Sequence, residues 1–319
     1  MNYAGRLFVM YKEDYTMNGI IPLWKERGMT SHDCVFKLRK ILRTKKVGHT
    51  GTLDPGVEGV LPICIGTATR IAEYLTDSGK TYEAVISISR TTTTEDAEGD
   101  TVEENTSHKA FTRAQIKDVL TSLTGVITQT PPMYSAVKVN GKKLYEYARA
   151  GQTVERPTRE VTIHELTLLS EGDVFEGEDV RFSVRVACSK GTYIRTLAVQ
   201  IGEALGYPAH MHELVRTASG TFTHDNCFTL AQVAELMEAE RIDEALLPVE
   251  HALREYPYVE ITADMEKQIM NGQVLPMHTM LEEHDKVVFG KNHKAFAVYI
   301  LHPTKQRMMK PDKMFPNVE

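Results

Sequence analysis

The chain has 319 residues, 42% of them hydrophobic and 25% charged, which is ordinary for a globular protein that buries a core in one or two domains. No apolar run reaches the roughly 18 residues of a membrane span, and residues 1–16 lack the continuous apolar core of a secretory signal. The four cysteines are scattered and form no Cys-x-x-Cys pair, so we expect a reduced, cytoplasmic protein with neither a disulfide framework nor a zinc ribbon.

The net charge of −6 argues at first sight against nucleic acid, but the charges are segregated along the chain. Residues 1–50 contain ten Lys or Arg and four Asp or Glu, whereas residues 225–266 contain two Arg and eleven Asp or Glu. A basic face can therefore exist on an acidic protein. Two ordinary solvated faces would give the same counts, so charge leaves both interpretations open.

In the first third of the chain, Thr30 and Ser31 are good N-caps and predict a helix that ends near Leu42. Its apolar residues recur at helical spacing on one face, and its lysines and arginines fall elsewhere. The other elements expected here are a strand at 18–24, a glycine-rich loop at 47–59, an apolar run at 60–65, a short helix at 68–77, a strand at 81–89 and a polar loop at 91–100.

Farther along, Thr112 and Gln115 have the spacing of a capping box and predict a helix to about Leu123. The remaining expected elements are strands at 161–170, 180–188 and 213–222, and helices at 192–205 and 230–240. Strands and helices do not alternate as regular βαβ units, which predicts an α+β fold with a mixed, largely antiparallel central sheet.

A domain boundary is expected near residues 235–250, where acidic residues precede Pro248. The tail has short strand-like runs at 286–289 and 295–301 and a basic end, so residues 251–319 predict a small all-β module. Residues 17–250 would then form the main domain.

The first candidate for chemistry is the glycine-rich loop that contains Asp54 and Pro55. Glycine lets the backbone approach a ligand closely, and the proline restricts Asp54 and holds its carboxylate at a rigid turn. The loop lacks the Gly-Lys-Ser/Thr ending of a phosphate-binding P-loop. An aspartate that merely caps a turn would look the same.

The second candidate is Arg195, which falls in the first turn of a predicted helix. A cation there is opposed by the helix dipole, and a nearby carboxylate would resolve the conflict. The alternative is an ordinary surface arginine.

Two further segments suit RNA. Tyr82, at the start of a strand, can stack on a base, although core tyrosines are commoner. Residues 126–155 contain an Asn140-Gly141 hairpin signal, and the interleaved basic and aromatic residues of 131–149 suit single-stranded or looped RNA. An exposed hairpin of mixed composition is the alternative.

Other chemistries have weaker support. His210 and His212, taken with His224 or Cys188, give no compact set of four ligands, so we expect no metal site. The nucleophile-elbow pattern Gly-x-Ser-x-Gly does not occur. Asp54 with Glu58 leaves a glycosidase-like pair open.

The stretch GHTGTLDP at 48–55, followed by GVLP at 59–62 and GTATR at 66–70, closely resembles the catalytic motif of the TruB family of tRNA pseudouridine synthases. The resemblance covers about residues 18–250. It continues in the same order through 80–82, 132–138, 141–149 and 188–196. Residues 1–16 precede the usual start, and Met17 is a second candidate for the initiator.

This resemblance implies an enzyme that isomerises uridine 55 in the T-loop of tRNA to pseudouridine without cofactor or metal. The base would flip out of the loop, and Asp54 would attack either the ribose C1′ or the uracil C6. The tail would be an RNA-binding PUA-like domain. The expected partner is the T-stem-loop, bound by a monomer. A non-catalytic tRNA-folding chaperone is the alternative.

The resemblance also assigns roles to individual residues. Arg195 would pair with Asp54 and keep it ionised, and Tyr82 would stack on the uracil and serve the proton transfers. The substrate-binding residues would be His49 on the T-loop, Tyr193 and Leu214 in the pocket, Lys25 as a basic contact, and Lys138, Lys142, Lys143 and Arg149 in a thumb, residues 126–152, that clamps the RNA.

Besides residues 1–16, three segments depart from the family pattern. Trp24 and Glu26 flank Lys25 where Asp-Lys-Pro is usual, which puts that turn in doubt. Residues 56–58 replace a segment where a small residue is common. Thr93 stands where an aspartate is frequent, so a loop-ordering or RNA-contacting role there is altered.

Overall fold

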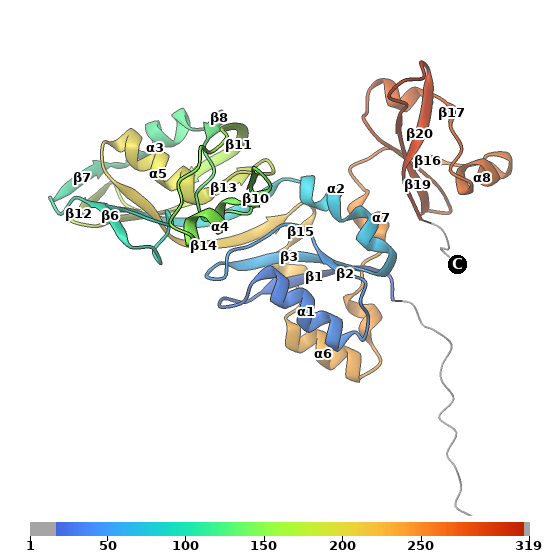
Figure 1. Cartoon of the computed structure of the whole chain (residues 1–319), viewed down its shortest axis with the longest axis horizontal. Helices are drawn as coiled ribbons and strands as arrows, with labels where there is room; N and C mark the ends of the chain where they lie inside the picture. Colours follow the sequence, from blue (N-terminus) through green and yellow to red (C-terminus); the bar gives the residue numbers. More distant parts are fainter. Residues whose placement is uncertain (1–16, 316–319) are drawn as a thin grey trace, which may run out of the picture.

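The computed structural model describes residues 17–315. A nine-stranded sheet runs through the main body (Figure 1), in the order β1-β3-β14-β4-β13-β11-β8, with β2 on β3 and β15 on β14. Its strands are β1 Gly19–Lys25, β2 Val47–His49, β3 Glu58–Ile65, β4 Lys80–Ile88, β8 Gly125–Gln129, β11 Arg159–Leu168, β13 Val180–Cys188, β14 Ala209–Ser219 and β15 Phe222–Thr223. All pairs are antiparallel except β3 with β14, so the predicted α+β fold with a mixed, largely antiparallel sheet is confirmed.

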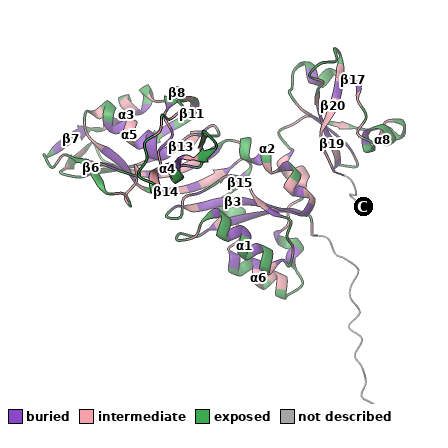
Figure 2. Cartoon of the chain, in the orientation of Figure 1, coloured by how far each residue is buried: buried purple, intermediate pink, exposed green. Residues whose placement is uncertain are grey.

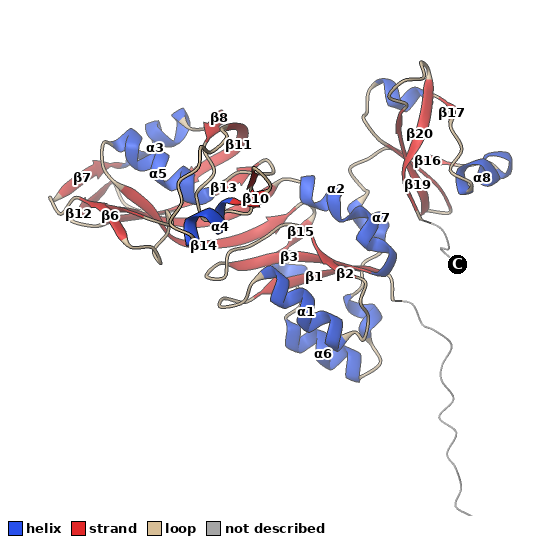
Figure 3. Cartoon of the chain, in the orientation of Figure 1, coloured by secondary structure: helices blue, strands red, loops and turns tan. Residues whose placement is uncertain are grey.

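Helices cover this sheet in two groups (Figure 3), and each group encloses a buried core (Figure 2). Helices α3 and α5 cover one core, and α1 and α6 cover the other. The helices of this part are α1 Ser31–Ile41, α2 Ala72–Asp77, α3 Arg113–Ser122, α5 Ile194–Leu205, α6 Leu230–Glu238 and α7 Val249–Ala252, with short 3₁₀ helices η1 Gly66–Ile71, η2 His224–Asn226 and η3 Ile242–Ala245. The predicted caps at Thr30 and Thr112 are confirmed, because both residues form capping boxes. Gly206 ends α5 in the left-handed conformation.

Three two-stranded sheets accompany the main sheet. They are formed by β5 Arg90–Thr92 with β6 Thr101–Glu104, by β7 Lys109–Thr112 with β12 Val174–Gly177, and by β9 Lys138–Val139 with β10 Lys142–Lys143, which leads into α4 Leu144–Arg149. The polar loop expected at 91–100 therefore begins as a strand, because three polar residues at a sheet edge carry no periodicity to read. The Asn140-Gly141 hairpin is confirmed, with φ of 50° and 83° at its two turn residues.

The C-terminal module is a five-stranded sheet in the order β16-β18-β19-β20-β17. Its elements are β16 Tyr258–Glu260, α8 Ala263–Met270, β17 Leu275–Pro276, η4 Thr279–Glu282, β18 Val287–Lys291, β19 Lys294–Leu301 and β20 Met308–Met314. The expected β-module is confirmed, and it also carries one helix, α8, that the sequence did not indicate. Its Ile269 is fully buried in the module's core, and Met265 packs beside it. Two apolar residues four apart among polar neighbours are too few to predict a helix from the sequence.

The module packs against the turn of helix that precedes β4. One hydrophobic cluster contains Ile71 and Tyr74 from this turn together with Val288 and Phe315 from the module. The Tyr74 hydroxyl donates to the carboxylate of Asp312, and polar contacts also join Arg70 Nη1 to the Met314 carbonyl at 2.7 Å and Lys313 to Glu73 at 3.1 Å. The module is therefore attached to α2, the helix that leads directly into β4.

Close packing of β3 on β14 requires a glycine at position 59. Gly59 has φ +135°, and a Cβ there would lie 2.3 Å from the carbonyl oxygen of Arg216. We expect Gly59→Ala to lower the free energy of unfolding by about 3 kcal/mol, because backbone strain and overlap add. Gly206→Ala is the control, since Gly206 has φ +81° in open space and isolates the strain, about 1 kcal/mol. If urea unfolding showed equal losses of unfolding free energy for Gly59→Ala and Gly206→Ala, the packing requirement at position 59 would be contradicted.

Candidate active site

A cleft of about 550 Å³ opens between the Asp54 loop, β4, the start of α5 and the first residues of the thumb. Five predicted site residues line it: Asp54, Tyr82, Tyr193, Arg195 and Leu214. They come from four separate parts of the chain, so the fold gathers the residues that the family motifs pointed to.

Asp54 sits at the turn that the Asp-Pro pair predicts, with the amide of Val57 donating to its carbonyl at 3.1 Å. The preceding Leu53 is buried, and its amide donates to the Ser31 hydroxyl at 2.8 Å. Lys25 donates through Nζ to the carbonyl of Pro55 at 3.3 Å. The loop is thus held on both sides of a carboxylate whose side chain remains 42% exposed to the cleft.

Arg195 approaches this carboxylate from the first turn of α5. Its side chain is only 7% exposed, and Nη2 lies 3.1 Å from Oδ2 of Asp54. The same guanidinium donates to the carbonyls of Thr94 at 3.0 Å and Tyr134 at 2.9 Å, and lies 4.0 Å from Asp96. The surface-arginine alternative is therefore wrong: two carboxylates offset the unfavourable helix dipole at a buried position.

The pKa of Asp54 is raised above its ordinary value. Burial against the cleft wall is the largest cause, and Asp96 adds to it by like-charge repulsion, while Arg195 and Lys25 pull the pKa down. The side chain still meets solvent on its open side, which limits the effect of burial. Arg195 thus favours the ionised form, as the resemblance implies, but does not outweigh burial.

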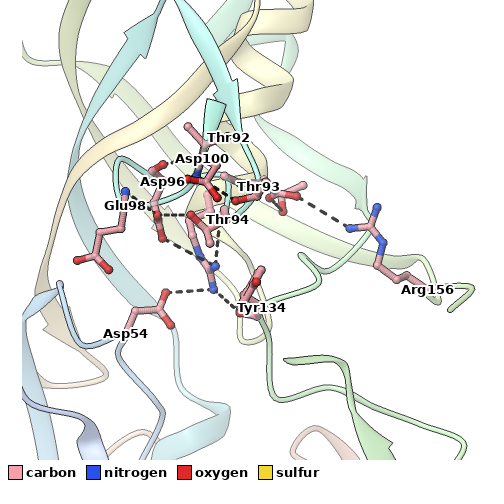
Figure 4. Close-up of polar contacts among 12 residues, drawn as sticks. Asp54, Thr92, Thr93, Thr94, Asp96, Glu98, Asp100, Tyr134 and Arg156 are labelled. Carbon is pink, nitrogen blue, oxygen red and sulfur yellow. Dashed lines mark hydrogen bonds and ion pairs between the residues drawn. The ribbon is translucent and has the colours of Figure 1, made fainter. Parts of the chain in front are cut away.

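Asp96 was not identified from the sequence, and its loop is ordered by its own side chains (Figure 4). Its Oδ1 accepts from the Thr94 hydroxyl at 2.5 Å and from the Glu98 amide at 3.0 Å. Thr93, the departure from the family pattern, exchanges main-chain and side-chain hydrogen bonds with Asp100. At this position, threonine closes the loop through its hydroxyl.

The ends of the thumb meet the same loop. Glu95 has a φ of 63°, and its carboxylate accepts from the Thr196 hydroxyl at 2.7 Å in the first turn of α5. Arg156, four residues after the thumb, lies 4.0 Å from Glu95 and donates to the carbonyl of Pro131, near the start of the thumb, at 2.9 Å. The thumb is therefore closed at its base beside Arg195.

Tyr82 lies directly across from Arg216 in the pairing of β4 with β14. Burial raises the pKa of the Tyr82 phenol, while the nearby Arg216 guanidinium favours its ionised form. Arg216 is 1% exposed and donates to the Val60 carbonyl at 2.7 Å, so it also fixes the strand that follows the Asp54 loop. Arg216 carried no recognisable signal in the sequence.

Lys80 lines the cleft two residues before Tyr82. Its Nζ donates to three main-chain carbonyls at the end of α2, those of Leu75, Thr76 and Ser78 at 3.1, 2.6 and 2.5 Å. Burial lowers the pKa of Lys80 to about 8. The lysine caps α2 and so joins the helix that carries the C-terminal module to the cleft wall.

The remaining predicted residues lie outside the lining of the cleft. Lys25 is fully buried behind the Asp54 loop, where burial lowers its pKa, an arrangement that suits a loop anchor rather than an RNA contact. His49 on β2 is half-buried, and burial lowers the pKa of its imidazole as well. The basic residues of the thumb stand on the β9–β10 hairpin and α4: Lys138, Lys142, Lys143 and Arg149.

Aromatic rings hold several of these thumb cations in place. Arg149 lies 5.2 Å from the ring centre of Tyr145, and Lys142 lies 5.8 Å from that of Tyr147.

Over residues 17–315 no cluster of three or more His, Cys, Asp or Glu has a metal-binding arrangement. Nor is any helix in that range long and apolar enough to cross a membrane.

Comparison with known proteins decides the family. Residues 39–194 match the model of the TruB family pseudouridylate synthase N-terminal domain, and residues 195–254 match that of the tRNA pseudouridylate synthase B C-terminal domain. The chain belongs to the TruB family. It is therefore an enzyme of the class that isomerises uridine to pseudouridine, which confirms the predicted family and reaction.

Relatives and solved structures agree with this assignment. A tRNA pseudouridine synthase B of Geobacillus thermodenitrificans is 55% identical over 301 residues, 94% of this chain and 100% of the relative. One of Bacillus cereus is 51% identical, over 94% of this chain and 98% of the relative. A chain in a Cbf5-Nop10-Gar1 complex superposes with a TM-score of 0.69 at 31% identity, covering 93% of this chain and 85% of that one.

The electrostatics of the TruB cleft predict how activity falls at low pH. As a nucleophile, the role that the family motif implies, Asp54 would have to be ionised, so the acid limb of the single-turnover rate is expected to follow its pKa. Asp96→Asn removes a charge that raises this pKa and is expected to move the acid limb to lower pH. Arg195→Met removes a charge that lowers the pKa of Asp54, so the acid limb is expected to move to higher pH. The single-turnover rate should also fall by about 10²-fold.

The control is Asp100→Asn, an exposed carboxylate in the same loop, which should reproduce the wild-type profile. Coincident acid limbs for the wild type and Asp96→Asn would contradict the role given to Asp96.

Proposed function

We propose that this enzyme acts on tRNA and isomerises uridine 55 in its T-loop. The observation that carries the proposal is the Asp54 carboxylate, open to a cleft and held at 3.1 Å by a buried Arg195. Relatives at 51–55% identity carry the name tRNA pseudouridine synthase B, which supports tRNA as the substrate.

The reaction exchanges one bond from ribose to base for another. The uridine flips into the cleft, because the atoms that react are inaccessible in a stacked loop. Asp54 attacks C1′ or C6, and the bond from N1 to C1′ breaks. The uracil rotates, C5 bonds to C1′, and the bond to Asp54 breaks, which restores the carboxylate. The C5 proton leaves to solvent and N1 gains one, so atoms balance without an oxidant or cofactor.

The other cleft residues have distinct tasks in this proposal. Tyr82 stacks on the uracil and serves the proton transfers, while Tyr193 and Leu214 shape the pocket around it. Arg195 keeps Asp54 ionised and correctly aimed. Solvent is excluded when RNA fills the cleft, which strengthens each of these interactions.

Binding of the T-stem-loop extends beyond the cleft. The thumb, residues 126–152, offers lysines and an arginine held by aromatic rings, a surface suited to phosphates and unstacked bases. His49 is the proposed contact for the remodelled T-loop, and the PUA-like module at 251–319 would bind a further part of the RNA. We place the protein in the cytoplasm, acting as a monomer.

The assignment is tested with a T-stem-loop RNA carrying tritium at C5 of the target uridine. Asp54→Asn is expected to reduce tritium release by at least about 10⁴-fold while RNA affinity changes less than about threefold, because the nucleophile is lost and the binding surface is kept. Asp225→Asn removes the same charge from a side chain that is 97% exposed, and it should release tritium like the wild type.

Wild-type release must also be catalytic, with many turnovers per protein molecule. A chaperone would instead be needed in stoichiometric amount. Normal release by the Asp54 variant would disprove the nucleophile, and no release by the wild type would disprove the substrate.

A further inference from the structure

Arg159 is a cation of the cleft to which no role has yet been assigned. It stands at the start of β11, directly across from Gln129 of β8, and its side chain lines the cleft with Tyr193 and Gly191. Its guanidinium lies 5.0 Å from the centre of the Tyr193 ring. Both Gln129 and Tyr193 are fixed, because the Gln129 amide group bonds to the amide and the carbonyl of Tyr193 at 2.9 and 3.2 Å.

Two nitrogens of this guanidinium, Nε and Nη2, are buried and have no hydrogen-bond partner among the described residues. Buried donors are nearly always paired, and an unpaired buried charge is especially unfavourable. The stacked Tyr193 ring compensates the charge only in part, and it accepts no hydrogen bond from this edge. Arg159 therefore lacks a partner, unlike Arg195 and Arg216, whose donors reach carboxylate or carbonyl oxygens.

The unpartnered edge has a specific geometry. Nε–H and one N–H of Nη2 point the same way from the planar group, and together they match two oxygens of a phosphate or carboxylate. Gly191 makes room for the group, because a Cβ at that residue would lie 3.1 Å from Nη1. The fold thus places a stacked, bidentate anion receptor on the wall of the cleft.

We propose that this edge of Arg159 binds a phosphodiester group beside the uridine that enters the cleft. The proposal rests on the proposed function, which brings RNA to this wall. A phosphate fits better than a base edge, since it supplies both the two oxygens and the negative charge that a guanidinium prefers. Arg159 is accordingly a positioning residue: it fixes the backbone of the flipped nucleotide while Asp54 acts on its sugar or base.

The test compares Arg159→Met with the wild type in binding a T-stem-loop RNA, with Asp54→Asn in both proteins to prevent turnover. Methionine keeps the length of the side chain and removes the donors and the charge. We expect about tenfold weaker binding, and a plot of log affinity against log salt whose slope is smaller by about 0.7, the value for one phosphate contact on a single strand. Arg159→Lys should keep the slope but recover only part of the affinity.

A second arm identifies the phosphate. Each phosphodiester near the target uridine is replaced, one at a time, by an uncharged methylphosphonate. At one position the wild type should lose about tenfold in affinity and Arg159→Met should lose nothing further. The control, Arg185→Met, removes an exposed arginine paired with Glu83 outside the cleft, and should lose affinity at that position as the wild type does.

Folding is checked by thermal melting. Arg159→Met should melt at or above the wild-type temperature without RNA, because an unpaired buried charge is removed. The inference is overturned if the salt slope does not change, or if Arg159→Met loses affinity at every modified phosphate as the wild type does. These arms measure binding alone, so they remain decisive even if the wild type releases no tritium, an outcome that would reject the proposed function instead.

Discussion

The pairing of buried Arg195 with Asp54 is the interaction on which the rest of the site depends. A guanidinium that is 7% exposed is stable only if its donors are satisfied, and here the oxygens come from Asp54, Thr94 and Tyr134 in three separate loops. One charge therefore holds the catalytic loop, the loop of Asp96 and the thumb together at the end of α5. The same charge favours the ionised form of the carboxylate that we propose as the nucleophile.

A second set of cations links this site to the rest of the molecule. Arg216 is buried between β14 and β3 and bonds to the carbonyl of Val60, which fixes the strand after the catalytic loop. Lys80 caps the end of α2, while Tyr74 of that helix bonds to Asp312 of the C-terminal module. The module and the cleft thus share one short helix, and RNA held by the module would be held at a set distance from Asp54.

Satisfied and unsatisfied charges have different uses in the cleft. Arg195 and Arg216 have protein partners and are preorganised before substrate arrives, so their donors need not reorient during the reaction. Arg159 has no such partner at Nε and Nη2 among the described residues, and in our proposal a phosphate of the RNA supplies it. Binding energy that is released only when the RNA is bound can offset the free-energy cost of extruding a nucleotide from its loop.

Local patterns in the sequence determined the α+β class, the caps at Thr30 and Thr112 and the Asn140-Gly141 turn. The family motif pointed to Asp54, Tyr82 and Arg195 as site residues. Tertiary structure decided the burial of Arg195 and Lys25, the parts of Asp96 and Arg216, the helix α8, and the unpaired edge of Arg159. The reason is that periodicity and capping depend on neighbours along the chain. Burial and charge pairing depend on segments that meet only after folding, such as Asp54 and Arg195, which lie far apart in sequence and 3.1 Å apart in space.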